Sequence, residues 1–126
     1  MAKILVIDDD RAVRHIVRQA LDELKLEIFD APTVEQGLSL QREHKPDLVL
    51  LDIMLPEISG LEAFHKLHAL DSKLPVIFMT AHNDIGVRKQ AMAGGAIAFL
   101  CKPFGHELFV KAVSAALQSG SYRKTQ

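Results

Sequence analysis

The stretch Leu48-Val49-Leu50-Leu51-Asp52 sets four consecutive large apolar side chains directly before a carboxylate. Apolar runs that do not alternate with polar residues are typical of strands covered on both faces, as in a parallel sheet. Three further runs have this character and one is weaker: residues 4–7 (ILVI), 76–79 (VIFM), 97–100 (IAFL) and, second in chain order, 27–29 (EIF). The sequence therefore predicts five strands, most of them buried on both faces.

Helical patterns lie between these runs. The clearest places apolar residues at helical spacing with charged residues on the other face: Val13, Ile16, Val17, Ala20, Leu21 and Leu24 against Arg14, Arg18, Asp22 and Lys25. Thr33 is expected to cap a second helix, which Gly37 weakens. Further helices are expected around residues 61–67 and 109–116. Residues 83–93 contain a glycine and few large apolar side chains, so we expect a loosely held fourth helix there.

Strand and helix thus alternate five times, which favours a parallel sheet with helices on both faces. Right-handed crossovers limit the possible arrangements. We predict an α/β fold of the flavodoxin-like, doubly wound type, with strand order 2-1-3-4-5 and five flanking helices. The predicted domain spans residues 1–118, and residues 119–126 are expected to form a polar tail or the start of a linker.

The composition is that of a globular domain of 126 residues, 48% hydrophobic and 25% charged, with a formal net charge of -1. This charge gives no general attraction to nucleic acid or to acidic membranes. The single cysteine, Cys101, excludes an internal disulfide and is typical of a reducing compartment. No apolar run approaches the ~18 residues of a membrane span. We therefore expect a cytoplasmic domain that neither binds nucleic acid directly nor enters a membrane.

Polar residues of complementary chemistry follow four of the predicted strands. In chain order they are Asp8, Asp9, Asp10, Asp52, Thr80 and Lys102. The carboxyl ends of parallel strands lie at one edge of the sheet, and the crevice between strands 1 and 3 is where such folds bind ligands. Carboxylates gathered there repel one another, and Mg²⁺ relieves that repulsion. Lys102 and Thr80 suit the oxygens of a phosphoryl group in transfer.

Each of these residues has an ordinary explanation when it is taken alone. Asp10 is expected only to cap the first helix, Lys102 alone would be a surface lysine, and Thr80 alone a turn residue. Because four strand ends carry matching groups, the pattern favours a phosphoryl site centred on Asp52.

Residues 3–118 resemble the receiver domain of two-component response regulators. The motifs that carry the resemblance are residues 6–9 (VIDD), 52–60 (DIMLPEISG), 79–81 (MTA) and 95–104 (GAIAFLCKPF). The Asp-x-x-x-Pro-x-x-x-Gly spacing together with a distant Lys-Pro-Phe is highly specific, although each motif alone is weak. The resemblance implies a phosphorylation-dependent switch rather than a turnover enzyme.

The resemblance also implies roles for the acidic motif residues. Asp52 would accept a phosphoryl group from a phosphohistidine of a sensor histidine kinase or phosphotransfer protein, in a reaction that needs Mg²⁺ or Mn²⁺. Asp9, Asp52 and the backbone carbonyl of Met54 would bind the metal directly, and Asp8 would act through a metal-bound water.

The remaining implied roles concern the relay of the signal. Lys102 would pair with Asp52 and the phosphoryl oxygens, held by a cis peptide to Pro103. Thr80 would hydrogen-bond the phosphoryl group, and Phe99 would turn inward behind it. The change would reach an output domain or a downstream protein through the face of the fourth helix, fifth strand and fifth helix. The sequence leaves open the cognate kinase, the output and dimerisation on phosphorylation.

Three histidines and one methionine need separate interpretation. Met54 and His82 occupy positions that flank the phosphoryl group in the resembling family, so they leave its lifetime open, and His82 is first interpreted as a loop residue without a role. His65 and His68 are expected on a solvated helix face, because the sequence offers no further ligand for a metal.

A haloacid-dehalogenase-like phosphohydrolase is the alternative interpretation, with Asp8 as its nucleophile and Asp10 completing an Asp-x-Asp motif. That family continues with Thr or Val two residues after the second Asp, where this chain has Ala12. The alternative also leaves the Asp52 motif unexplained. A degenerate receiver that only binds partners would be expected to lack one of the site residues, and all of them are present.

Overall fold

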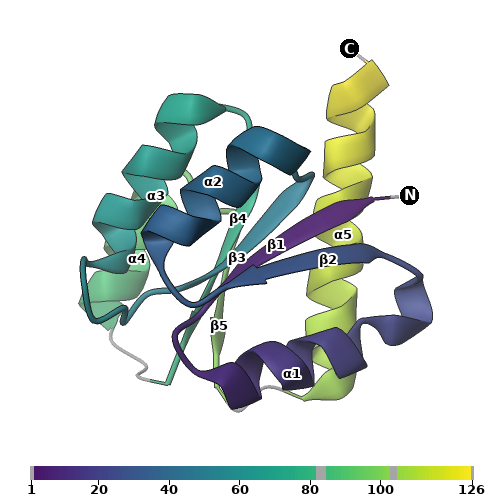
Figure 1. Cartoon of the computed structure of the whole chain (residues 1–126), viewed down its shortest axis with the longest axis horizontal. Coiled ribbons are helices and arrows are strands. Elements are labelled where there is room, and N and C mark those ends of the chain that lie inside the picture. The colour runs from purple at the N-terminus through teal and green to yellow at the C-terminus, as the bar shows by residue number, and fades with distance from the viewer. Residues whose placement is uncertain (1, 82–84, 103–104, 126) are drawn as a thin grey trace.

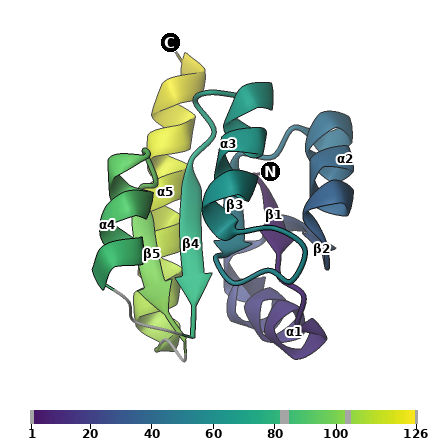
Figure 2. The same cartoon turned by 90° about the vertical axis from the view of Figure 1, so that its left-hand side faces the viewer.

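The computed structural model describes residues 2–81, 85–102 and 105–125, and its strands form one parallel sheet (Figure 1). The strand order is β2-β1-β3-β4-β5, as predicted. The strands are β1 (Lys3–Ile7), β2 (Glu27–Ala31), β3 (Leu48–Asp52), β4 (Val76–Thr80) and β5 (Ala98–Cys101). All neighbouring pairs are parallel, so the carboxyl ends of the strands share one edge of the sheet, at the bottom of Figure 2.

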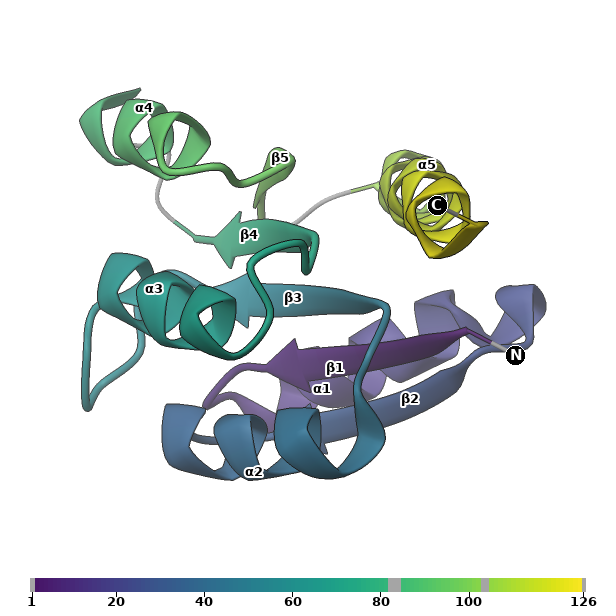
Figure 3. The same cartoon turned by 90° about the horizontal axis from the view of Figure 1, so that it is seen from above.

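Helices cover both faces of the sheet (Figure 3). α1 (Arg11–Ala20) and α5 (His106–Thr125) pack on one face. α2 (Val34–His44), α3 (Gly60–Leu70) and α4 (Ile85–Ala93) pack on the other. Each face has its own apolar core, because β1, β3 and β4 alternate buried side chains between the two faces.

The first helix differs from its prediction in two respects. Ile16, expected in the core, is 56% exposed. The contact with the sheet is narrower than the apolar pattern suggested and is centred on Val17 and on Leu21, the residue that caps the helix. It also ends at Ala20, and a short 3₁₀ helix, η1 (Asp22–Leu24), follows it. The helical spacing located the buried face correctly but not its width or the end of the helix.

Gly37 lies where α2 packs closely on the Ile7 side chain of β1. A Cβ atom at this position would come 2.5 Å from Cδ1 of Ile7. The cost of a glycine within a helix, about 1 kcal/mol, is therefore offset by close contact between helix and sheet. The hydroxyl of Thr33 accepts the N–H of Gln36 at 3.2 Å, which confirms the predicted N-cap.

α3 and α4 cover the same face of the sheet but are held unequally. Ser59 caps α3, which buries Phe64 and Leu67 completely. In α4, Ala91 is the one buried residue in the described part of the helix, and Ile85 is exposed. The predicted weak packing of the fourth helix is confirmed from residue 85 onward, and residues 83 and 84 lie outside the described part of the chain.

The prediction of a solvated face for His68 was wrong. Its Nε2 lies 2.9 Å from the backbone oxygen of Leu74. Because a carbonyl can only accept, Nε2 is the donor and carries a hydrogen. The imidazole also lies against the ring of Phe64, with 4.1 Å between ring centroids. His65 is exposed, as expected.

The last helix continues to Thr125, so the backbone is helical through most of the segment predicted as a tail. No proline interrupts this segment, and Gly120 costs only about 1 kcal/mol within a helix. The division of the chain at residue 118 stays a prediction. None of the helices in the described ranges has the length and apolarity that crossing a bilayer requires.

Candidate functional site

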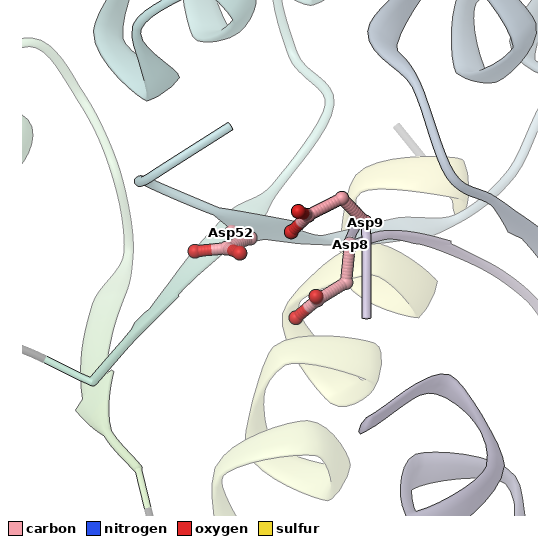
Figure 4. A group of neighbouring side chains, drawn as sticks. All are labelled: Asp8, Asp9 and Asp52. Atoms are coloured by element: carbon pink, nitrogen blue, oxygen red, sulfur yellow. The ribbon is translucent and has the colours of Figure 1, made fainter. Parts of the chain in front are cut away.

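Three carboxylates meet at the carboxyl edge of the sheet (Figure 4). Ile7 pairs with Leu51 across β1 and β3, so Asp8 and Asp52 follow at neighbouring positions. One carboxylate oxygen from each of Asp8, Asp9 and Asp52 lies within 4.8 Å of the others. Asp8 and Asp52 are buried and Asp9 is exposed, so the cluster opens to solvent on the Asp9 side.

Both carboxylate oxygens of Asp8 accept hydrogen bonds. Its Oδ1 accepts the N–H of Asp10 at 2.9 Å, and its Oδ2 accepts Nζ of Lys102 at 2.7 Å. Nζ of Lys102 lies farther from Asp52, 3.6 Å from its Oδ2. In this structure the main partner of Lys102 is therefore Asp8, although the ammonium also faces Asp52. Asp10 caps α1 by accepting the N–H of Ala12 at 2.9 Å, as predicted.

The pKa of Asp52 is raised above its ordinary value. Burial is the largest cause, and the charges of Asp8 and Asp9 add to it. The hydrogen bond from the N–H of Met54 to Oδ1, at 3.0 Å, and the charge of Lys102 act in the opposite direction. Three carboxylates thus face one ammonium in the described part of the chain.

A divalent cation fits this donor set. Carboxylate oxygens at the mouth of a crevice are the ligands that Mg²⁺ prefers, and Mg²⁺ keeps several waters where solvent can enter. Asp9 and Asp52 could hold such an ion on the open side of the cluster. Burial is the main reason that the pKa of Asp52 is raised, and a cation there would relieve the part that comes from the charges of Asp8 and Asp9.

The loop from β3 to α3 turns back sharply after Asp52. The N–H of Gly60 donates to the carbonyl of Ile53 at 3.0 Å. A Cβ at Gly60 would come 2.4 Å from Cα of Ile53. Only glycine fits this contact, which gives a physical reason for the Gly in the Asp-x-x-x-Pro-x-x-x-Gly spacing. Met54 lies in the loop with its side chain exposed.

Thr80 and Phe99 lie on the neighbouring strands. Thr80 ends β4 and is fully buried, and its carbonyl accepts the N–H of Lys102. Phe99 is buried in β5, next to Phe78. The ring of Phe99 is therefore turned inward in this structure. His82 and the predicted cis peptide before Pro103 lie outside the described residues.

Sequence reasoning missed the contacts of Arg14. It was assigned to the solvated face of the first helix, but its Nε donates to Oδ2 of Asp30 at 2.9 Å. Its Nη1 donates to the backbone oxygen of Asp8 at 2.7 Å. Arg18 binds the other oxygen of Asp30 at 2.7 Å. The helical pattern carried no signal for this cluster, because the partner carboxylate comes from β2.

A second missed contact involves Glu57, in the middle of the loop between β3 and α3. Its Oε1 accepts the backbone N–H of Val34, the first residue of α2, at 2.9 Å. No periodic pattern in the sequence indicates this bond, because it joins a loop to the end of a helix far away in the chain.

Comparison with known proteins gives a consistent result. The family model described as the response regulator receiver domain matches residues 4–114. The C4-dicarboxylate transport transcriptional regulatory protein DctD of Pseudomonas aeruginosa is 39% identical over 116 residues, which are 92% of this chain and 25% of that protein. Response regulator MprA of Mycobacterium sp. (strain KMS) is 34% identical over 94% of this chain and 52% of its own length. The chain thus spans between a quarter and about half of these relatives.

Solved structures show the same fold. A CheY-like response regulator receiver domain protein from Methanospirillum hungatei JF-1 superposes with a TM-score of 0.90 at 26% identity, covering 98% of each chain. The BeF3-activated DrrB receiver domain gives a TM-score of 0.85 at 30% identity, over 94% of this chain and 98% of that one.

Proposed function

Because the chain belongs to the family of response regulator receiver domains, we propose that Asp52 is the phosphoacceptor of a phosphorylation-dependent switch. The family consists of signalling domains rather than turnover enzymes. The observation that carries the assignment is the position of Asp52 at the end of β3. There its buried carboxylate faces Asp9, Asp8 and the ammonium of Lys102.

In the proposed reaction an ionised oxygen of Asp52 attacks the phosphorus of a phosphohistidine on a histidine kinase or phosphotransfer protein. A P–O bond to Asp52 forms as the P–N bond breaks, and the leaving imidazole keeps the electron pair and takes a proton from water. Lys102 balances the charge on the transferring oxygens, and the hydroxyl of Thr80 donates to one of them. The only later reaction proposed for the phosphorylated protein is hydrolysis of this aspartyl phosphate, which returns Asp52 to its free form.

Mg²⁺, or Mn²⁺, would be held by Asp9, Asp52 and the backbone carbonyl of Met54, with Asp8 acting through a water. When bound it would supply positive charge next to the phosphoryl oxygens. The fit of the three carboxylates to such an ion supports this part of the proposal.

Thr80 and Phe99 are proposed to relay phosphorylation to the face formed by α4, β5 and α5. The weak packing of α4 supports this route, since moving elements come from the less stable parts of a fold. Large apolar side chains are exposed in these helices and just before β5: Ile85 and Met92 in α4, Ile97 before β5 and Leu108 in α5. We propose that an output domain or downstream protein docks there, in the cytoplasm.

The alternative phosphohydrolase would use Asp8 as its nucleophile. The contacts favour Asp52 instead, because both oxygens of Asp8 are already hydrogen-bonded and its side chain has no exposed surface. A nucleophile needs an oxygen that can reach an incoming phosphorus atom.

The test uses acetyl phosphate and Mg²⁺ with the whole chain, followed by intact mass measurement. We expect wild type to gain one acid-stable, base-labile phosphoryl group and Asp52→Asn to gain none. Equal labelling of wild type and Asp52→Asn would contradict the proposal. Labelling that is lost in Asp8→Asn but kept in Asp52→Asn would favour the phosphohydrolase.

A further inference from the structure

Glu57 lies in the loop between β3 and α3, the loop that follows Asp52 and carries Met54. Figure 2 shows this loop curving below α3. Glu57 is an exposed residue, yet its Oε1 accepts the N–H of Val34 at 2.9 Å. The bond therefore joins the middle of the loop to the first turn of α2, which precedes it in the chain.

The chemistry of a helix N-terminus makes this a favourable bond. The first backbone N–H groups of a helix have no partner within the helix. In α2 the hydroxyl of Thr33 satisfies the N–H of Gln36, and Glu57 satisfies that of Val34. A carboxylate at this end of a helix also interacts favourably with the helix dipole.

α2, to which the loop is bonded, is itself packed tightly on the sheet. It packs on β1 with Gly37 against the side chain of Ile7, so closely that a Cβ at Gly37 would overlap it. Ile7 is the residue before Asp8. The two ends of the loop are fixed as well, by the bond from Met54 to Asp52 and by the bond from Gly60 to Ile53.

We propose that Glu57 is a positioning residue that holds the loop between β3 and α3, and with it the Met54 carbonyl, in place for metal binding. The contact route runs from Ile7 through α2 to Glu57. It therefore fixes the loop after β3 relative to the carboxylates after β1. The proposal rests on the proposed function, which assigns metal binding to Asp9, Asp52 and Met54.

The test measures Mn²⁺ affinity from the electron paramagnetic resonance signal of the free ion, a readout independent of phosphorylation. Glu57→Ala is expected to weaken Mn²⁺ binding about ten-fold, as loss of a group supporting metal ligands does. Glu57→Gln keeps an acceptor oxygen and should stay within about two-fold of wild type. Glu35→Ala removes an exposed carboxylate from the same helix turn and should also stay within about two-fold.

A second pair of variants removes the donor instead of the acceptor. Val34→Pro deletes the N–H at the first helical position, where proline is tolerated. Thr33 already has the extended conformation that precedes proline, with φ -134° and ψ 160°. Val34→Ala keeps the N–H and reports the loss of packing alone. We expect Val34→Pro to bind Mn²⁺ more weakly than Val34→Ala. Adding Glu57→Ala to Val34→Pro should cause no further loss.

Three results would overturn the proposal: Glu57→Ala binding Mn²⁺ as wild type does, Glu57→Gln binding as weakly as Glu57→Ala, or additive losses in the double variant. Labelling of wild type by acetyl phosphate separates the two hypotheses. If wild type is labelled and these variants behave identically to it, only the role of Glu57 fails. If wild type is not labelled on Asp52, the proposed function fails regardless of Glu57.

Discussion

Asp30 and Asp52 lie in the strands on either side of β1, and their surroundings are electrostatically opposite. Burial raises the pKa of Asp30, but the hydrogen bonds and charges of Arg18 and Arg14 outweigh it, so that pKa lies below its ordinary value. The pKa of Asp52 is raised instead, by burial and by its acidic neighbours. The charge of Asp30 is compensated within the fold by two arginines, whereas Asp52 has two acidic neighbours and one ammonium nearby, which suits the cation and phosphoryl group proposed for it. The difference is the one expected between an ion cluster that stabilises the fold and a site that carries out chemistry.

The largest expected difference between the two clusters concerns phosphorylation. Lys102→Met should slow labelling of Asp52 by acetyl phosphate about 100-fold, because it removes the ammonium that faces the transferring oxygens. Arg18→Ala, which removes a cation from the Asp30 cluster, should leave the rate within about two-fold of wild type. Time courses of intact mass provide the measurement. Equal rates for the two variants would remove the functional distinction between the clusters.

Metal binding should stabilise the folded protein through the Asp52 cluster and not through the Asp30 cluster. At a Mg²⁺ concentration of about 100 times Kd, the free energy of unfolding of wild type should rise by about 2.7 kcal/mol. Asp9→Asn should lose most of this gain, whereas Asp30→Asn should keep it. Urea unfolding with Mg²⁺ and with EDTA measures the effect. A gain of the same size in Asp9→Asn would place the ion elsewhere.

Removing Asp30 from its cluster with Arg14 and Arg18 should lower the free energy of unfolding both with Mg²⁺ and with EDTA. Asp30→Ala leaves the guanidinium of Arg14, which is largely buried, without its carboxylate partner. We expect a loss of about 1–2 kcal/mol, less than for a fully buried pair because Asp30 is partly exposed. Asp22→Ala, an exposed control in η1, should change the free energy of unfolding by less than about 0.5 kcal/mol. If the two variants are equally stable, Asp30 contributes nothing beyond an ordinary surface charge.

The smallest effects are in the pH dependence, and they have opposite signs. The lowered pKa of Asp30 means that its contribution to stability is present above its unfolded pKa and is lost as pH falls through the folded value. The stability difference between wild type and Asp30→Asn should therefore shrink in acid. The raised pKa of Asp52 makes its ionised form unfavourable in the fold, so without metal Asp52→Asn should be the more stable protein at neutral pH. That advantage should fade as pH falls and Asp52 takes up a proton. Thermal unfolding in EDTA between neutral and acidic pH tests both signs.

The sheet was predictable because its central strands have an unusual composition. The runs at residues 4–7, 48–51 and 76–79 are apolar throughout, and this indicates strands with two covered faces. The strand order followed from the alternation of elements, and with it the edge where Asp8, Asp9 and Asp52 meet. A parallel sheet brings strand ends together by topology, so these residues could be placed without knowledge of any side-chain contact.

Other features depend on tertiary contacts that no periodic pattern contains. Ile16 has the spacing of a buried residue, but the helix meets the sheet over too narrow a stripe to cover it. Lys102 was correctly placed at the carboxyl edge of the sheet. Its shortest hydrogen bond is nevertheless to Asp8, and this depends on the conformation of its side chain, which the sequence does not indicate. Gly37 lowers the helix propensity of its segment, and in the structure it allows α2 to pack closely on Ile7 of β1.

The pairing of β1 with β3 joins Ile4 to Leu48, so two distant parts of the chain must meet before this pair of strands can form. Contacts between distant segments form slowly, because the loop between them must first be closed. Asp8 and Asp52 are supplied by these two strands, and β2 and α2 lie between them in the chain. A nascent chain that still lacks β3 therefore lacks Asp52, and an unfolded chain does not hold Asp52 next to Asp8. Under the proposed function, labelling of Asp52 would therefore report on folding, because it can begin only when the native topology has formed.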